Sequence, residues 1–438
     1  MSLPTQPYKG ARDFYPEDKR IQKYMFRTIR GAVESFGYEE YDAPILEPLE
    51  LYLAKSGEEI VNEQTYAFTD RGGRQVAIRP EMTPTVSRMV AARRQELSYP
   101  LRWYSIPNLW RYERPQRGRL REHWQLNVDL FGLDGVQTES ETISVADTIL
   151  RSFGAKRSMY EIRLNHRGLV DYMLGQYLGL DAVQSHSMAK LIDRMAKMDT
   201  ATFEMQADAI CTPGQREQGT LQALLALLHT KELSHLPDQL KVHPAVQDLD
   251  SLITSLKDGG VTNVRFDVTL MRGFDYYTGI IFEVFDLNPE NNRSMFGGGR
   301  YDGLVGLFGV EPVATVGFGM GDVTLQNFLE SHGLLPELAC DTDLYVVLIG
   351  DVTAPAARVV KEMRDNGLRV AVDYSGRKPD KQIKVASKKG IPYVLFIGER
   401  ELQDEIYVLR NLVSGEEERH GVARIVSLVE DHRKHDDR

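Results

Sequence analysis

The spacing of apolar residues divides the chain into segments with different expected structures. Residues 18–36 carry apolar side chains at close to the helical period of 3.6, and Gly37 ends that helix. A short strand-like segment around Pro44 follows, and then strand-like stretches at residues 75–78, 101–113 and 124–131. Turns, with few crossover helices, separate these stretches. The order predicts a mainly antiparallel sheet in an α+β domain.

The strand pattern is interrupted over about residues 168–235. Apolar residues there recur at helical spacing over 169–178, 187–198 and 215–229, with a break at Thr212-Pro213-Gly214. Strand-like residues return at 263–286. We therefore expect a first domain over residues 1–335 that contains a helical insertion.

The last quarter of the chain alternates strands and helices. Apolar strands are expected at residues 344–349, 368–372 and 393–397, with helices at 354–366 and 379–389 between them. This alternation predicts a small, mostly parallel α/β domain over about residues 340–430.

Composition and charge narrow the class of protein. The chain has 438 residues, of which 42% are hydrophobic and 26% charged, so two or three domains can each bury a core. No apolar run approaches the roughly 18–20 residues of a membrane span, and the N-terminus lacks the apolar stretch of a secretory signal. Cys211 and Cys340 match no metal spacing, which favours free thiols in the cytoplasm. The net charge of −10 disfavours a nonspecific nucleic-acid coat but permits a specific RNA partner.

The segment at residues 111–131 predicts a hairpin that carries chemistry. Gln125, Asn127 and Asp129 alternate with apolar residues, so they share one face of a strand. Arg111 and Glu113 stand two apart on the preceding strand. The connecting loop is longer than a turn requires and carries Arg114, Arg117, Arg119 and Arg121. Because a guanidinium can donate two hydrogen bonds to a phosphate, the loop favours a nucleotide or nucleic-acid contact over a solvated charge run.

Three further segments place polar groups beside apolar strands. LMRGFDYYTGIIFE at residues 270–283 contains an arginine, which should face an anionic partner, and two adjacent tyrosines. GGGRYDGL at residues 297–304 predicts a Gly-rich turn. RPEMTP at residues 79–84 displays Glu81 at the end of a strand.

Together these segments resemble the signature motifs of histidyl-tRNA synthetases. The hairpin resembles motif 2 of class II aminoacyl-tRNA synthetases, and KGARDF at residues 9–14 resembles the family's opening segment. The resemblance implies a class II catalytic domain followed by an anticodon-binding domain. It implies that L-histidine and ATP, with Mg²⁺, form histidyl-adenylate, and that the histidyl group passes to tRNA(His). It also implies a homodimer, through the helix before Gly37 and the strand around Pro44, and no metal site built from protein ligands alone.

The resemblance assigns roles to individual residues. Arg111 and Arg272 are expected to neutralise phosphate charge as the catalytic residues, and Glu113 to reach the adenosine side of ATP. The histidine-binding set is Glu81, Thr83, Arg111, Gln125, Asp129, Arg272, Tyr276 and Tyr277, and for Tyr276 packing in the core is an equal alternative. The ATP-binding set is Arg111, Glu113 and Arg272. The tRNA-binding candidates are Arg114, Arg117, Arg119 and Arg121 in the loop, and Lys378 and Lys381 on a basic helix of the second domain.

Two departures from the family pattern keep other functions open. Thr324 stands where these synthetases usually place the motif 3 arginine, and Glu122-His123-Trp124 replaces the usual Gln-Phe-His. One alternative is a noncatalytic, synthetase-like regulatory subunit of ATP phosphoribosyltransferase, and another is a tRNA-sensing pseudo-synthetase. The intact motifs, the basic loop and the C-terminal domain favour the enzyme, whereas Thr324 favours the alternatives.

Overall fold

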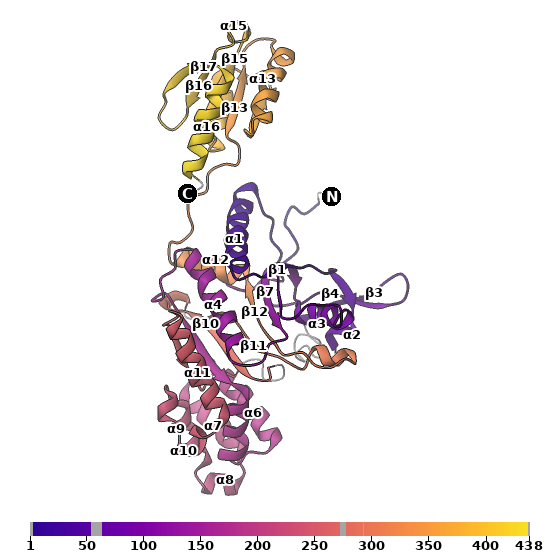
Figure 1. The fold of residues 1–438 in the computed structure, drawn as a ribbon, viewed down its shortest axis with the longest axis vertical. Coiled ribbons are helices and arrows are strands. Elements are labelled where there is room, and N and C mark those ends of the chain that lie inside the picture. The colour runs from indigo at the N-terminus through magenta and orange to yellow at the C-terminus, as the bar shows by residue number, and fades with distance from the viewer. Residues whose placement is uncertain (1–2, 54–63, 272–276, 292, 437–438) are drawn as a thin grey trace. The chain divides into compact units, whose positions relative to one another are not determined.

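The computed structural model describes residues 3–53, 64–271, 277–291 and 293–436. The chain forms two compact units (Figure 1). One unit comprises residues 1–15 and 22–335, and the other comprises residues 16–21 and 336–438.

A nine-stranded sheet organises the first unit. Its strand order is β1 (Glu39–Glu40), β5 (Leu101–Ser105), β7 (Glu122–Phe131), β12 (Thr315–Gly321), β11 (Ser294–Arg300), β10 (Ile280–Asp286), β8 (Tyr160–His166) and β9 (Val264–Phe266), and β6 (Asn108–Trp110) pairs with β7 beside this path. Only the outermost pairs in this order, β1 with β5 and β8 with β9, are parallel. The sheet is therefore mainly antiparallel, as the sequence predicts.

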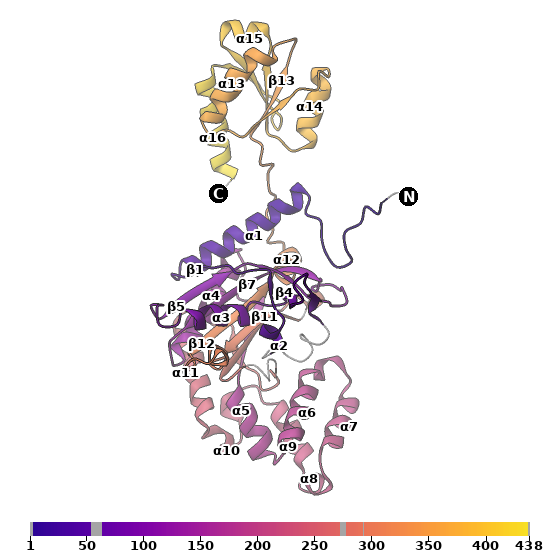
Figure 2. The ribbon, with the colours of Figure 1, turned by 90° about the vertical axis from the view of Figure 1, so that its right-hand side faces the viewer.

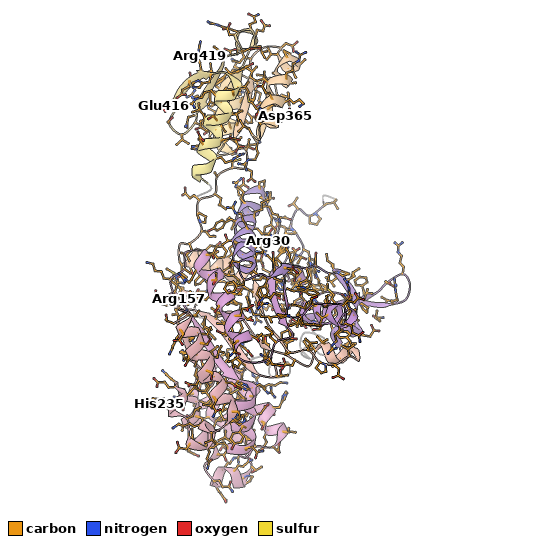
Figure 3. The ribbon with its side chains drawn as sticks, in the orientation of Figure 1. Arg30, Arg157, His235, Asp365, Glu416 and Arg419 are labelled. Carbon is orange, nitrogen blue, oxygen red and sulfur yellow. The ribbon has the colours of Figure 1, made fainter. Side chains whose placement is uncertain are left out.

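Helices α4 (Gln137–Ser152) and α11 (Pro244–Asp258) pack against one another and against the sheet (Figure 2). The apolar residues Leu126, Val128 and Leu130 of β7 are fully buried on the core side. Arg157, which is labelled in Figure 3, forms an ion pair of 2.8 Å with Asp147 of α4. The alternation along β7 thus divides an apolar face, which packs in the core, from a polar face.

Helix α1 (Pro16–Glu34) buries Met25, Ile29 and Val33, which are spaced four residues apart, as the periodicity predicts. Arg30 of α1 pairs with Glu40 of β1 at 2.8 Å (Figure 3). A second sheet has three strands in the order β2 (Leu46–Pro48), β4 (Gln75–Ile78) and β3 (Tyr66–Thr69). The same part of the chain forms helices α2 (Glu50–Leu53) and α3 (Thr83–Ala92). Helix α12 (Asp322–Ser331) follows β12 of the main sheet.

Three expectations about strands are wrong in detail. Residues 101–113 form two strands rather than one, because Pro107 interrupts the ladder where a backbone N–H is required. Pro44 lies between β1 and β2 and in neither of them. The Gly-rich segment 297–300 belongs to strand β11 and is not a turn. None of its three glycines has a positive φ, so conformational freedom is not the reason for them.

Residues 167–241 are helical apart from their connections, and α6 to α9 gather at one end of the first unit (Figure 2). The elements are α5 (Arg167–Tyr172), a π-helix (Met173–Tyr177), α6 (Ala182–Asp193), a 3₁₀ turn (Met195–Lys197), α7 (Thr200–Ile210), α8 (Pro213–Glu217), α9 (Thr220–Leu228), a second 3₁₀ turn (Leu233–His235) and α10 (Asp238–Lys241). The expected break at residue 212 is the start of α8, where the Thr212 hydroxyl caps the Gln215 N–H. Gly219, with φ +78°, then separates α8 from α9.

The second unit has a five-stranded sheet of order β14 (Val370–Asp373), β13 (Leu344–Leu348), β15 (Tyr393–Ile397), β16 (Tyr407–Asn411) and β17 (Glu417–His420). The first three strands are parallel, as expected, but β16 and β17 add an antiparallel hairpin that the sequence did not indicate. The helices are α13 (Thr353–Asp365), α14 (Pro379–Lys388), α15 (Glu399–Asp404) and α16 (Val422–Asp436).

Both cysteines are free thiols, as predicted. Across the described ranges, no helix is long and apolar enough to cross a membrane.

Candidate active site

The polar face of β7 looks across a surface made of glycines. In the strand register, Asp129 lies opposite Gly317 of β12, which lies opposite Gly299 of β11. In the next row of that face, Asn127 lies opposite Gly319, and Gly319 opposite Gly297. Since paired residues project from the same face of a sheet, the β7 side chains border an area with no side chains on two neighbouring strands.

These glycines are required by close contacts. A Cβ atom on Gly317 would collide with Asp129 Oδ1 and would lie 2.9 Å from Tyr301 Oη. A Cβ on Gly319 would lie 3.0 Å from Gln125 Cδ, and one on Gly299 would lie 3.0 Å from Tyr277 Cδ1. The predicted residues Gln125, Asp129 and Tyr277 are thus brought to one surface, and the glycines leave space for them.

Asp129 is the buried acidic group of this surface. Tyr301 donates its hydroxyl hydrogen to Asp129 Oδ1. Asp129 Oδ2 is buried and forms no hydrogen bond with the described residues, and the buried Tyr41 hydroxyl, which lies near this carboxyl group, forms none either. Desolvation raises the pKa of Asp129 to about 7, against the smaller opposing effects of the Tyr301 and Tyr41 hydroxyls. A buried carboxylate oxygen without a donor is costly in the free protein, and it can be satisfied by an N–H group of a ligand.

Arg111 lies beside the segment that follows β4. Its Nε donates to the carbonyl oxygen of Pro80 at 2.9 Å, which positions the guanidinium next to the residue before Glu81. Thr83 is the first residue of α3, and both Glu81 and Thr83 are half-buried. The structure therefore brings the predicted phosphate-binding arginine and the predicted ammonium-binding segment together.

Glu113 and His123 flank Arg111 on the hairpin. The Glu113 side chain is 12% exposed, and its Oε2 lies 3.5 Å from Arg119 Nη1. Burial, and secondarily the charges of Arg111 and Arg12, lower the pKa of His123 to about 3. His123 is thus a neutral ring beside cationic groups at physiological pH.

Arg12 of the KGARDF segment is joined to the start of α12. Its Nη2 lies 2.6 Å from Asp322 Oδ2, and Asp322 Oδ1 accepts the Trp124 N–H at 3.0 Å. The Arg12 guanidinium also lies 4.8 Å from the centre of the Phe14 ring. Burial raises the pKa of Asp322, while Arg12 opposes that effect. This partly buried pair joins the N-terminal segment to β7 and α12.

Thr324 supplies no cation at the start of α12. Its hydroxyl donates to the carbonyl oxygens of Met295 and Gly321, at 3.0 and 3.1 Å. Besides Arg12, Arg293 is a cation near this helix start, and its Nη1 donates to Arg117 O at 3.0 Å. A Cβ placed on Gly118 would lie 3.6 Å from both Arg293 Nη1 and Thr324 Cγ2. Arg293 therefore occupies the neighbourhood of Thr324, although 31 positions separate them in the sequence.

The tRNA-binding candidates differ in their surroundings. Arg114, Arg117 and Arg119 are exposed on the hairpin loop, whereas Arg121 folds back and donates from Nε to Glu113 O at 3.0 Å. Lys378 and Lys381 are exposed at the start of α14. Other exposed basic residues around α14 are Arg377, Lys384, Lys388 and Lys389.

Two predicted residues, Arg272 and Tyr276, lie outside the described residues. Sequence reasoning gave no role to three residues that the structure places here: Tyr301, Arg293 and Glu283. Glu283 is 6% exposed and lies opposite Gly297, in the same row as Asn127. A single carboxylate within the apolar run of β10 was the available signal for Glu283. Over the described ranges, no group of three His, Cys, Asp or Glu side chains could hold a metal ion.

Comparisons with known proteins agree with the resemblance. Residues 10–322 match the family model for histidyl-tRNA synthetase, and residues 343–432 match that for an anticodon binding domain. The chain is 44% identical over 424 residues to the histidine--tRNA ligase of Leptospira biflexa, covering 94% of both chains. It is 38% identical over 426 residues to that of Thermoplasma volcanium, covering 96% of this chain and 97% of the other.

A similar solved structure, the histidyl-tRNA synthetase of Nostoc sp. PCC 7120, has a TM-score of 0.82 at 24% identity and covers 98% of this chain and 100% of that one. Its likeness concerns the fold alone. The family model covers well over half of the chain, and the curated relatives cover nearly all of it. The chain belongs to the histidyl-tRNA synthetase family of class II aminoacyl-tRNA synthetases.

Proposed function

We propose that this protein is a histidine--tRNA ligase whose histidine pocket lies on the glycine-lined face of the nine-stranded sheet. The pocket assignment rests on the hydrogen bonding of the buried Asp129 carboxylate. Its Oδ1 accepts a hydrogen bond from Tyr301, and its Oδ2 forms no hydrogen bond with the described residues. An imidazole N–H is a donor of suitable size for that oxygen.

In this proposal the pocket recognises both ends of histidine. Asp129 accepts a ring N–H, and the Tyr277 hydroxyl pairs with the other ring nitrogen, which selects one tautomer. Gln125, and Tyr276 by sequence pattern alone, complete the ring pocket. Glu81 and Thr83 hold the α-ammonium group, and their position beside Arg111 supports placing the carboxylate there.

The first chemical step is attack by the histidine carboxylate oxygen on the α-phosphorus of ATP. The new O–P bond forms as the bond from that phosphorus to the bridging oxygen breaks, and pyrophosphate leaves with the bonding electrons. Arg111 and Arg272 neutralise the charge that develops on the α-phosphate; Arg272 enters through the sequence pattern alone. Positioning the two substrates supplies much of the remaining rate gain.

Glu113 contacts the adenosine side of ATP, and Arg293 supplies the cation that Thr324 lacks. The support for Arg293 is its place between the hairpin loop and the start of α12. Mg²⁺ enters with ATP and is held mainly by phosphate oxygens and water, since it needs few protein ligands.

In the second step a ribose hydroxyl at the acceptor end of tRNA(His) takes the histidyl group from the adenylate. The exposed arginines of the hairpin loop would contact the acceptor end, together with Arg121, while Lys378 and Lys381 would contact RNA elsewhere. We assign catalysis to a domain over residues 1–335 with an insertion at about 168–235. Anticodon binding is assigned to about residues 340–430.

We further propose a homodimer and a cytoplasmic location. β1 is an edge strand of the main sheet, and Ile45 and Leu46, which follow β1 in the chain, are 51% and 49% exposed. A sheet edge with exposed apolar residues nearby is a surface on which a second copy of the chain could pack. Sedimentation equilibrium tests whether the protein is a dimer. The cytoplasmic location is proposed because the proposed reaction serves protein synthesis.

The decisive experiment is ATP–pyrophosphate exchange with each standard amino acid separately. We expect exchange with histidine alone. Absence of exchange from folded, histidine-binding protein would instead favour the regulatory subunit of ATP phosphoribosyltransferase or a tRNA-sensing protein.

A further inference from the structure

Four aromatic rings gather beside the arginine loop and have no role in the chemistry above. They are Tyr8 of the N-terminal segment, Tyr66 of β3, Trp110 of β6 and Tyr112 in the hairpin. The Tyr66 ring centre lies 5.6 Å from that of Tyr112, 5.9 Å from that of Trp110 and 6.5 Å from that of Tyr8, with edge-on geometry in each case. We call these four rings the aromatic platform.

Arg121 adds a fixed cation to the aromatic platform. Its guanidinium carbon lies 4.0 Å from the centre of the Tyr112 ring and 5.5 Å from that of Tyr8, and Nη1 donates to Tyr8 Oη at 3.0 Å. Gly10 allows this approach, because a Cβ there would lie 2.8 Å from Arg121 Cγ. The side chain is thus held by rings, by backbone and by a hydroxyl.

Core packing does not explain the outer rings. Tyr8 and Tyr112 are each 52% exposed, although neighbouring rings and Arg121 hold them in place. Arg114, Arg117 and Arg119 are exposed on the same hairpin. Fixed, exposed rings next to a row of arginines have the composition of surfaces that bind single-stranded nucleic acid, where bases stack on rings and cations follow the phosphates.

We propose that the aromatic platform stacks an unpaired nucleobase at the single-stranded acceptor end of tRNA. The proposal rests on the proposed function, which supplies tRNA as the RNA partner. Tyr112 follows Arg111 directly in the chain, so the aromatic platform adjoins the backbone that carries the proposed phosphate-binding arginine. Stacking uses the face of the base, so the platform contributes affinity with little preference between bases.

Substitution of the outer rings tests this role. Tyr112→Leu and Tyr8→Leu should each raise the KM for tRNA, or the Kd of the tRNA complex, by roughly 5- to 150-fold, the range of losing one base–aromatic stack. Histidine-dependent pyrophosphate exchange should stay at the wild-type rate. Tyr112→Phe, which keeps the ring, and Phe308→Leu, which removes an exposed ring elsewhere, should bind tRNA like the wild type.

A tRNA with a single abasic nucleotide, placed in turn at each unpaired acceptor-end position, identifies the stacked base. At one position the abasic change should lower the affinity of the tRNA for the wild-type protein. The same change should not lower further the already reduced affinity of the tRNA for Tyr112→Leu. Unchanged tRNA affinity in both leucine variants would overturn the proposal. Loss of exchange in Tyr112→Leu but not in Tyr112→Phe would also overturn it, because the ring would then serve adenylate formation.

Failure of the proposed function gives a different result. A wild-type protein without histidine-dependent exchange would refute the ligase assignment. Equilibrium binding of the same tRNA set to the full chain still measures the aromatic platform independently.

Discussion

Tyr301 donates its hydroxyl hydrogen to Asp129 Oδ1, although 172 positions separate the two residues in the sequence. The contact joins the residue after β11 to the C-terminal half of β7, and Gly317 of the intervening strand leaves space for it. The second oxygen of this buried carboxylate forms no hydrogen bond with the described residues. The first predictions concern this arrangement.

Removing the charge of Asp129 should impair histidine binding more than ATP binding. We expect Asp129→Asn to raise the KM for histidine by about 10- to 100-fold, because a charge-assisted hydrogen bond of roughly 1.5–3 kcal/mol is lost. Tyr301→Phe should raise it less, since the carboxylate remains. Pyrophosphate-exchange kinetics with either substrate varied measure both effects. Equal increases in the two KM values would contradict the assignment.

The pKa of Asp129, about 7, predicts how the stability of Asp129→Asn, compared with that of the wild type, depends on pH. This folded-state pKa is above that of an unfolded aspartate, so the protonated group favours the fold at low pH, and that contribution is lost as the pH rises towards and through 7. Asp129→Asn should therefore gain stability relative to the wild type between pH 5 and pH 8, by about 1–3 kcal/mol. Urea unfolding at both pH values measures the difference, and a pH-independent difference would refute the prediction.

The ionisation of Asp129 should also control histidine binding. Ionised Asp129 destabilises the fold but should favour the binding of histidine. Below pH 7 the protonated Asp129 cannot accept as a carboxylate, so the KM for histidine should rise as the pH falls from 8 to 6. The dependence should be weaker in Asp129→Asn, where only the ionisation of free histidine remains. Exchange assays across this pH range compare the two proteins, and parallel profiles would be the contrary result.

Two glycines on the same strand should tolerate alanine differently. A Cβ on Gly317 would meet the carbonyl oxygen of Val128 at 2.6 Å, whereas one on Gly319 meets the end of the Gln125 side chain at 3.0 Å. Gly317→Ala should thus destabilise the protein by about 1–3 kcal/mol and raise the KM for histidine. Gly319→Ala serves as the matched control with the smaller loss of stability. Thermal unfolding of both variants orders them, and the reverse order would contradict the geometry.

Arg293 should matter for ATP and not for histidine. Arg293→Ala is expected to raise the KM for ATP by about 10-fold, consistent with loss of one charge-assisted phosphate contact. Thr324→Arg in the same variant should restore binding, because it returns a cation to the adjoining position. Exchange kinetics at varied ATP concentration provide the measurement. An Arg293→Ala variant with unchanged ATP kinetics would show that this cation does not contact the nucleotide.

The basic start of α14 should affect only the tRNA-dependent step. Lys378→Ala combined with Lys381→Ala should raise the KM for tRNA by about 3- to 10-fold and reduce its dependence on salt, as expected for lost phosphate contacts. Lys361→Ala on α13, an exposed lysine paired with Asp365, is the control. Aminoacylation at two salt concentrations distinguishes these lysines from an ordinary solvated surface, for which both variants would behave alike.

The sequence by itself determined much of the framework. The apolar period placed α1, and the alternation along β7 separated a buried apolar face from the face that carries Gln125 and Asp129, because these periods follow from local backbone geometry. The motifs indicated the family, and the two-part organisation followed from the change of pattern near residue 340. All of these signals lie within short stretches of sequence.

Only the tertiary structure decided how distant stretches meet. The contact of Tyr301 with Asp129 and the position of Arg293 beside Thr324 depend on the order of the strands in the sheet, which periodicity does not encode. The glycines of β11 illustrate the same limit. Locally a Gly triplet is typical of a turn, but in the sheet it is an extended strand whose neighbours leave no space for a Cβ atom.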